Sequence, residues 1–488
     1  MATTPASRTN GHHGHPSIAR SVSTGLVLAG AAITAGGIFC FPLFAPTLAL
    51  KLSLTQPQLS TIALAGMSAQ YPLAAVMGSL LDTYGTWLTC FIAGILFSTG
   101  FGLFAFQLGH VSTQSPFEVL VACFFIAGVG TAASLFTIMF SASQAFPGHT
   151  GIATGASTAF FGLSPLFLSF VASAFFSTND GELDVKRFLI TLSITAGIAH
   201  ILAAAFLRVF PTKTDHIPEP DEEISDPVPV LHATEETPLL AQPNKPAPQS
   251  QTIGQLLKDV DFWLLAFSML LLLGSCEMLI SNIGTMVLGV PETRDGVTTG
   301  DSFLKSSTGG AVQVRLLSLS NTCARLLIGP LADYLAPAPL AHPTGDIYFP
   351  RKRYFSRLAF MSGFCALTVV AFLWMAAGVV SQKDIYFVSI ATGIAYGGSF
   401  TVAPSIVGSL WLGPSAGRNF GLITYAPFIG TPLFSYLYAF ISSSYQLEDG
   451  AVCTGTRCWR KTFWITSATS VLAFILTLIL LKRRRDRV

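Results

Sequence analysis

Two ionisable residues interrupt long apolar stretches of this sequence, and each could do chemistry there. Arg325 follows Asn321 by four residues, and Glu277 lies in the run Gly274-Ser-Cys-Glu-Met278. A guanidinium can hold a carboxylate through two parallel hydrogen bonds, whereas a carboxyl group removed from water favours its neutral form and can carry a proton. Because a charge in an apolar interior costs ~2.5–3.5 kcal/mol or more, such residues face a partner or a wet cavity. They are the first candidates for a binding site.

Each candidate also has a structural interpretation. Arg325 could lock its helix to a neighbouring helix, and Glu277 could be a permanently neutral carboxyl that is hydrogen-bonded to another helix. Further polar residues within apolar runs could line the same cavity, or equally form hydrogen bonds between helices. They are Asn321, Asn282, Gln70, Tyr71 and Tyr396. Of these, Asn321 shares a helix face with Arg325, since residues four apart are neighbours on a helix surface.

The elements that must position these residues are membrane-spanning helices. The chain is 51% hydrophobic and 11% charged, whereas an average soluble domain is about 25% charged. A bilayer core ~30 Å thick needs about 20 apolar residues per helix. Twelve segments meet this requirement, at residues 24–50, 59–81, 87–106, 117–140, 151–176, 188–209, 262–288, 312–332, 358–380, 385–411, 420–441 and 462–481. The sequence therefore predicts an all-α membrane protein with twelve transmembrane helices.

An acidic, proline-rich segment divides these helices into two sets of six. We expect a disordered tail at 1–22, an N-terminal half at 23–210, a cytosolic linker at 211–257, a C-terminal half at 258–481 and a basic tail at 482–488. The dense basic clusters at 351–357 and 482–487 fall on the same side as the N-terminus, which predicts that both termini are cytosolic. The net charge of +2 gives no reason to expect a nucleic-acid partner.

The two halves also repeat each other. Gly78-Ser-Leu-Leu-Asp82 at the end of the second span returns as Gly329-Pro-Leu-Ala-Asp333 at the end of the eighth, and three further short matches follow in the same order. Repeated halves of this kind are typical of secondary transporters, which rock one half against the other around a central site.

Two six-helix halves joined by a cytosolic linker resemble the major facilitator superfamily over the whole chain. Gly78-x-x-x-Asp82-x-x-Gly85 resembles the signature of that superfamily, although Thr83, Thr86 and Trp87 replace its usual basic residues. The resemblance implies that Asp82 faces the start of the eleventh span and that Asp333 faces the start of the fifth. These carboxylates, with Gly78, Gly85 and Gly329, would then form gates that close the cytosolic side, because free helix N–H groups attract a carboxylate.

Four stretches resemble, more narrowly, the nodulin-like group and the fungal relatives of the monocarboxylate transporters. They are Leu54-Thr-Gln-Pro-Gln-Leu-Ser-Thr-Ile62, Asp261-Phe-Trp-Leu-Leu265, Ser281-Asn-Ile-Gly284 and Ser318-x-x-Asn321-x-x-x-Arg325. In monocarboxylate transporters an Asp one turn before the matching Arg helps to handle the substrate anion. Here Asn321 occupies that position, and the acidic residue and the lysine of that family's first span are absent.

These observations together predict a secondary transporter that moves a small organic solute, a monocarboxylate-like anion, by alternating access, with a proton as the candidate coupling ion. The alternatives are a transporter of a neutral or cationic metabolite, in which Arg325 is only a lock, and a membrane sensor that binds a solute without moving it. The sequence has no phosphate-binding loop of an ATP-driven pump and no nucleophile–base or metal constellation. We therefore expect neither an enzyme nor a bound cofactor or metal.

Two peripheral features concern location and the non-cytosolic side. Glu235-Glu-Thr-Pro-Leu239-Leu240 fits an acidic-dileucine sorting signal that an adaptor could reach, which favours the vacuolar membrane over the plasma membrane, although so short a pattern also arises by chance. Cys453 and Cys458 lie together in the loop before the last span. On the non-cytosolic side oxidation is permitted, so we predict a disulfide rather than two free thiols.

Overall fold

The computed structural model describes residues 18–109, 117–145, 150–177, 183–209, 252–290, 302–336, 340–341, 347–348, 352, 354–411, 416–445, 453 and 455–484. The first half contains α1 (Ile18–Ala35), η1 (Gly36–Cys40), α2 (Phe41–Lys51), α3 (Gln56–Ser68), α4 (Ala74–Tyr84), α5 (Thr86–Gly109), α6 (Phe117–Ala145), α7 (Thr150–Phe175) and α8 (Val185–Val209). The second half contains α9 (Ile253–Lys258), α10 (Val260–Leu288), α11 (Ser302–Leu335), α12 (Arg357–Ala377), η3 (Gln382–Asp384), α13 (Ile385–Leu410), α14 (Ala416–Ile423), α15 (Tyr425–Ser443), η4 (Thr456–Cys458) and α16 (Arg460–Arg483). Two-residue strands β1 (Leu340–Ala341) and β2 (Ile347–Tyr348) pair between α11 and α12.

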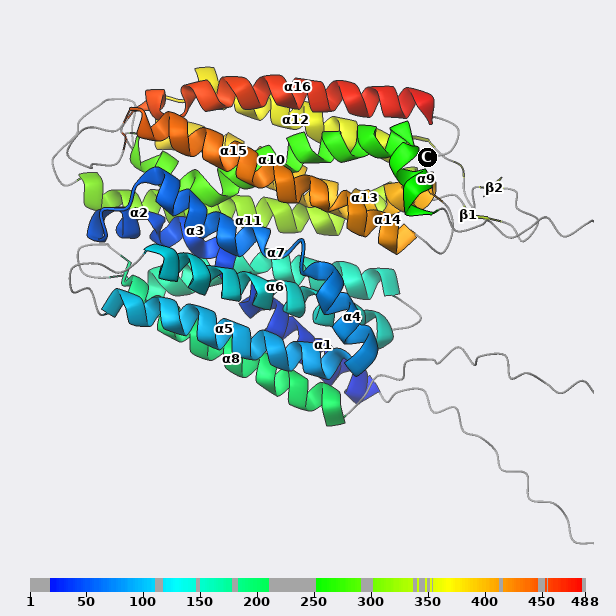
Figure 1. Cartoon of the computed structure of the whole chain (residues 1–488), viewed down its shortest axis with the longest axis horizontal. Coiled ribbons are helices and arrows are strands. Elements are labelled where there is room, and N and C mark those ends of the chain that lie inside the picture. Colours follow the sequence, from blue (N-terminus) through cyan, green and yellow to red (C-terminus); the bar gives the residue numbers. More distant parts are fainter. Residues whose placement is uncertain are drawn as a thin grey trace, which may run out of the picture.

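The helices form two groups that lie against each other (Figure 1). Helices α1 and α5 to α8 pack together in the first group, whereas α10, α11, α12, α13, α15 and α16 pack together in the second. Contacts of α2 with α10, α3 with α15, and α7 with α11 join the groups. The start of α1 and the end of α16 lie at one end of this bundle, which we call the proximal end; the opposite end is the distal end (Figure 1).

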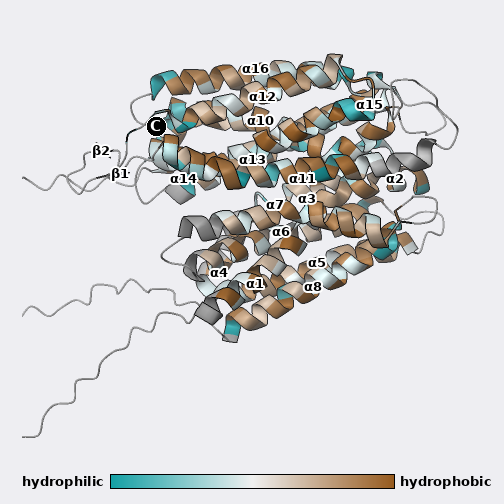
Figure 2. Ribbon diagram, turned by 180° about the vertical axis from the view of Figure 1, so that it is seen from behind, coloured by the Kyte–Doolittle hydropathy of each residue, from teal (hydrophilic) through white to brown (hydrophobic). Residues whose placement is uncertain are grey.

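The outside of the bundle is suited to lipid. Large apolar side chains such as Phe106, Leu202 and Phe440 are exposed, and hydrophobic residues follow the length of the helices while hydrophilic ones gather mainly toward the helix ends (Figure 2). Ten helical segments among the described residues are long and apolar enough to cross a bilayer. The second and eighth predicted spans are not among them: the second is split into α3 and α4, and α11 carries two arginines within its predicted span.

Three predicted spans are not continuous α-helices, which corrects the sequence analysis. The second span is interrupted by turns at residues 69–73, the first contains the 3-10 segment η1, and the eleventh is divided at Thr424. Pro72 lies in the first of these breaks, where its missing N–H and its ring disfavour a helical hydrogen bond to the preceding turn. The break in the second span matters most, because it places Tyr71 at the centre of the bundle.

Glycines allow the helices of the site to approach closely. A Cβ atom on Gly284 of α10 would lie 1.9 Å from the carbonyl oxygen of Pro42, and one on Gly274 would lie 2.5 Å from the carbonyl carbon of Gly430 in α15. Small residues at helix interfaces let backbones pack closely in membranes, where helix association depends on packing and hydrogen bonds. Helix α10 is therefore held tightly against both its own half and the opposite half.

Candidate functional site

Glu277 of α10 is buried and is surrounded by hydroxyl groups from three other segments. Its Oε1 accepts a hydrogen bond from the Tyr71 hydroxyl in the break of the second span and another, of 2.9 Å, from the Tyr396 hydroxyl of α13. Its Oε2 lies 2.5 Å from Oγ1 of Thr431 in α15. The carboxyl group thus connects three helices of the second half to one segment of the first half.

The hydrogen bonds around Thr431 bear on whether the carboxyl group of Glu277 carries a proton. A hydroxyl has a single hydrogen to donate but two lone pairs to accept with. Thr431 Oγ1 lies 2.8 Å from the carbonyl oxygen of Pro427 as well as 2.5 Å from Glu277 Oε2. When Thr431 donates to Pro427, the contact with Oε2 is a hydrogen bond only if Oε2 carries the proton. A neutral Glu277 that donates to Thr431 and accepts from both tyrosines satisfies every group.

Arg325 of α11 is partly buried and keeps most of its donors free. Its Nε donates to Oδ1 of Asn321 over 3.1 Å, and its guanidinium carbon lies 5.8 Å from the centre of the Phe400 ring. Within the part of the chain that the structure describes, no protein group accepts a hydrogen bond from its two terminal nitrogens, and no carboxylate lies within 4.0 Å. A fork of unpaired donors is the geometry that receives a carboxylate.

Arg325 and Glu277 belong to one neighbourhood without forming an ion pair. The Tyr396 ring packs edge-on against Phe400 with centroids 4.9 Å apart, and Phe400 in turn lies beside Arg325. The structure therefore brings together five of the residues expected at a central site, which are Arg325, Asn321, Glu277, Tyr71 and Tyr396. Tyr396 lies between the cation and the carboxyl group.

Asn282 and Gln70 contact other parts of the protein. Asn282 Oδ1 accepts hydrogen bonds from Gln56 over 2.9 Å and from Ser60 over 3.0 Å, both in α3, and its Nδ2 donates to Met278 and Ser281. All its hydrogen-bonding positions are thus occupied, and it ties α10 to the first half. Gln70 donates to the carbonyl oxygen of Met67 at the end of α3.

The structure gives partners or surroundings for some of the residues expected to form gates. Asp333 of α11 accepts a hydrogen bond of 2.6 Å from Arg357 at the start of α12, in its own half. That Asp333 faces the start of the fifth span stays a prediction. Gly85 ends α4 with a φ of +84°, a conformation that favours glycine. Gly78 and Asp82 lie in α4, and Gly329 packs near Thr401 of α13.

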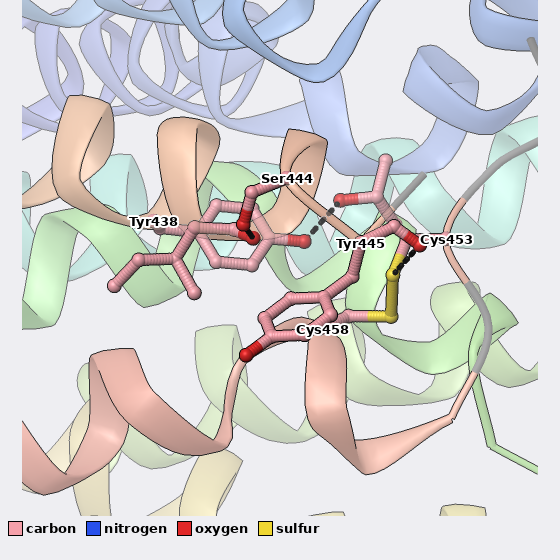
Figure 3. The surroundings of a disulfide bond; sticks show 7 residues. Tyr438, Ser444, Tyr445, Cys453 and Cys458 are labelled. Carbon is pink, nitrogen blue, oxygen red and sulfur yellow. Dashed lines mark hydrogen bonds between the residues drawn. A yellow bond between two sulfur atoms is a disulfide. The ribbon is translucent and has the colours of Figure 1, made fainter. Parts of the chain in front are cut away.

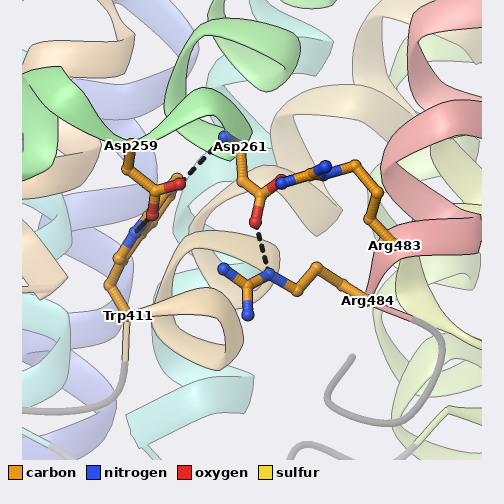
Figure 4. Close-up of polar contacts among 5 residues, drawn as sticks. All are labelled: Asp259, Asp261, Trp411, Arg483 and Arg484. Atoms are coloured by element: carbon orange, nitrogen blue, oxygen red, sulfur yellow. Dashed lines mark hydrogen bonds and ion pairs between the residues drawn. The ribbon is translucent and has the colours of Figure 1, made fainter.

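A cluster at the proximal end was not foreseen from the sequence. Asp261, at the start of α10, is 1% exposed at its side chain and binds Nε of both Arg483, over 2.7 Å, and Arg484 (Figure 4). The neighbouring Asp259 caps α10 by accepting from the Asp261 N–H, and its other oxygen accepts from Trp411 over 2.9 Å. The basic residues that indicated orientation thus also hold α10 to α16. An acidic residue at the start of an apolar span was the available signal.

At the distal end, Cys453 and Cys458 form a disulfide beside Tyr445, whose carbonyl oxygen lies near the Cys453 sulfur (Figure 3). The N–H of Gly455 within this small loop donates to the carbonyl oxygen of Gly289 over 2.7 Å. The loop is thereby fixed to the end of α10. The expected sorting residues Glu235, Leu239 and Leu240 lie outside the described residues, as does most of the linker.

Apolar helices that are long enough to cross a bilayer enclose a buried carboxyl group and a guanidinium, as in a multi-pass membrane protein. The family model for the Major Facilitator Superfamily matches residues 27–424. The chain therefore belongs to the Major Facilitator Superfamily, and the predicted superfamily and fold class are confirmed.

Relatives and solved structures agree with this membership. The chain is 27% identical to the "Probable transporter MCH1" of Gibberella zeae, with 91% of this chain and 86% of the relative covered, and 24% identical to that of Saccharomyces cerevisiae, with 93% and 91% covered. Similar folds include the inward-open xylose transporter XylE from E. coli, with a TM-score of 0.60, 12% identity and coverage of 94% and 96%. The nucleoside transporter NupG has a TM-score of 0.56 at 15% identity, with 95% and 99% covered.

Proposed function

We propose that this protein is a secondary active transporter of a small organic anion of the monocarboxylate type. It works by alternating access, takes up a proton at Glu277, and resides in the vacuolar membrane with both termini in the cytosol. The two halves meet around Glu277. Tyr71 reaches Glu277 from the first half, so any movement of one half against the other would change this contact.

The observation that carries this proposal is the free fork of Arg325. An arginine that served only as a lock would donate its hydrogen bonds to a neighbouring element. Arg357 does so with Asp333 and the carbonyl oxygen of Ala336. Arg325 instead directs one donor to Asn321 on its own helix. An anion that occupied the remaining donors would neutralise the charge and remove the cost of an unpaired cation in the membrane.

The proton assignment rests on the surroundings of Glu277. Three hydroxyl groups can support both states of its carboxyl group, since they can all donate to the ionised form or rearrange around the neutral one. With Arg325 cationic and Glu277 neutral, a single bound monoanion leaves the centre without net charge. Binding a proton and an anion together therefore produces a site that can pass through the closed bundle at low electrostatic cost.

Uptake by the purified protein in proteoliposomes tests the proposal. A panel of radiolabelled monocarboxylates, dicarboxylates, sugars and amines is offered with and without a pH gradient, and we expect flux of a monoanion that the gradient accelerates. Arg325→Lys should lower that flux at least tenfold, because lysine retains the charge but loses the planar fork. Arg208→Lys is the matched control, since Arg208 lies over the Trp87 ring in the first half.

The result separates the competing functions. Unchanged flux with Arg325→Lys would contradict the proposal that the guanidinium of Arg325 holds the substrate carboxylate. Flux of only neutral or cationic solutes would contradict the proposal that the substrate is an anion. A sensor would bind its solute in the same liposomes without moving it.

A further inference from the structure

Helices α7 and α11, which belong to opposite halves, are joined by a pair of residues on one face of α11. Arg315 donates from Nε to the Ser169 hydroxyl over 3.1 Å and from Nη2 to the Ser169 carbonyl oxygen over 3.1 Å and the Ser173 hydroxyl over 2.6 Å. Its guanidinium also lies 4.2 Å from the centre of the Phe170 ring. Arg315 lies within α11, and among the described residues its hydrogen bonds go to α7.

Ser318, three residues further along α11, forms hydrogen bonds with the backbone of α7. Its hydroxyl donates to the carbonyl oxygen of Gly162 over 2.7 Å and accepts from the N–H of Leu166 over 3.1 Å. In an uninterrupted helix that N–H would donate to that same carbonyl, four residues earlier. Pro165 lies inside α7 next to Leu166 and contributes no N–H of its own. Ser318 therefore bridges the two backbone groups that one hydrogen bond of the α7 ladder joins.

This contact has two alternative states that both satisfy the backbone. While α11 touches α7, Ser318 bridges Gly162 and Leu166; when α11 withdraws, these two groups can pair with each other. Withdrawal consequently leaves no buried backbone group unpaired, a condition that would otherwise be costly. Arg315 has neutral partners, and no carboxylate within 4.0 Å among the described residues, so separation leaves no unpaired buried anion. Such a contact can be broken and remade in every cycle.

We propose that Arg315 and Ser318 form the latch that holds the distal side closed, with Ser169, Ser173 and the backbone of α7 between Gly162 and Leu166 as its receiving surface. Arg315 lies ten residues before Arg325, about 15 Å along the helix toward the distal end. The latch therefore lies between the candidate anion site and the distal surface. The inference rests on alternating access, which is part of the proposed function.

Distances between spin labels test the latch. One label is placed at Ser177→Cys after α7 and one at Lys383→Cys before α13, two exposed distal positions in opposite halves, with the exposed free cysteine removed by Cys323→Ala. The ratio of long to short distances then reports opening of the distal side. We expect Arg315→Gln and Ser318→Ala each to raise this ratio at least tenfold, which corresponds to about 1.4 kcal/mol.

Two matched controls isolate the contact between the halves. Arg460→Gln removes a distal arginine that donates to Ala376 within the second half, and Ser320→Ala removes a hydroxyl that donates to Leu317 in its own helix. Both should leave the ratio unchanged. Ser318→Ala removes one hydroxyl only, so it tests the latch even if loss of Arg315 impairs folding.

The outcomes separate the latch from the transport mechanism. If the wild-type distances respond to pH and to added lactate while Arg315→Gln and Ser318→Ala behave as the wild type does, the latch is refuted and alternating access stands. Equal shifts in the controls would also refute it. A wild-type distance that stays single under every condition would contradict alternating access and the latch together.

Discussion

Replacing Glu277 by glutamine separates the proton from the hydrogen bonds of the site. The glutamine oxygen can accept from Tyr71 and Tyr396 as Oε1 does, and its amide group can donate to Thr431 Oγ1 in place of the acid hydrogen. Glu277→Gln thus copies the neutral carboxyl group and cannot lose a proton. We expect the variant to fold with near wild-type stability and to exchange substrate for substrate.

The magnitude of the effect on coupling follows from the stoichiometry of one proton. A gradient of one pH unit supplies about 1.36 kcal/mol per proton, which supports a tenfold accumulation of substrate, and two units support about a hundredfold. With Glu277→Gln the accumulation ratio should fall to one while exchange continues. The assay compares pH-driven uptake with counterflow in the same proteoliposomes, and Asp184→Asn, an acid-to-amide change beside Arg187 in a distal loop, is the control.

Two measurements would refute this reasoning. Accumulation by Glu277→Gln that still follows the pH gradient would make Glu277 structural and place coupling elsewhere. Thermal unfolding supplies the second test. Glu277→Ala removes the hydrogen bonds that Glu277 makes with three hydroxyl groups, and at ~0.6 kcal/mol for each membrane hydrogen bond it should cost about 2 kcal/mol or more. If Glu277→Gln destabilises the protein as much as Glu277→Ala does, glutamine does not reproduce the hydrogen bonds of a neutral Glu277, and the reasoning is wrong.

Three further predictions concern other parts of the chain. Arg483→Gln combined with Arg484→Gln should destabilise the protein more than Asp261→Asn does in thermal unfolding, by up to ~3–5 kcal/mol, because it leaves a buried carboxylate unpaired whereas asparagine leaves arginines that reach water; the reverse order would disprove this account. Tyr71→Phe should slow pH-driven uptake more than Thr61→Val, which removes another hydrogen bond between the halves, to Tyr436; equal effects would deny Tyr71 a special role. Leu239→Ala with Leu240→Ala should move a fluorescently tagged protein from the vacuolar membrane to the cell surface, and an unchanged location would make the motif a coincidence.

The candidate residues were predictable from the sequence, whereas most of their partners were not. Arg325 and Glu277 stand out because a charge inside an apolar run is costly wherever the helix lies. Tyr71, however, meets Glu277 across 206 residues, and Asp261 meets Arg483 across 222. Residue spacing indicates which residues share a helix face but not which face of another helix they meet.

The breaks in the spans were missed for a related reason. Residues 59–81 are apolar enough to read as one helix, and Pro72 alone does not show whether a helix bends or stops. The helix stops at residues 69–73, where Tyr71 bonds to Glu277 of the opposite half, a contact that residue spacing does not reveal. Ser318 was noticed as part of a motif, but its bonds to Gly162 and Leu166 depend on how α7 of the other half packs against α11.

The pairing of Asp261 with the last helix has a consequence for how the protein is made. Arg484 is synthesised 223 residues after Asp261, which corresponds to roughly 11–45 s at a rate of ~5–20 residues per second. During that interval the carboxylate at the start of α10 has neither of its arginine partners, and α10 enters the membrane before its final anchor exists. Insertion of α16 therefore supplies the arginine partners that Asp261 of α10 lacks until then. A chain truncated before Arg483 would lack both partners of this buried carboxylate.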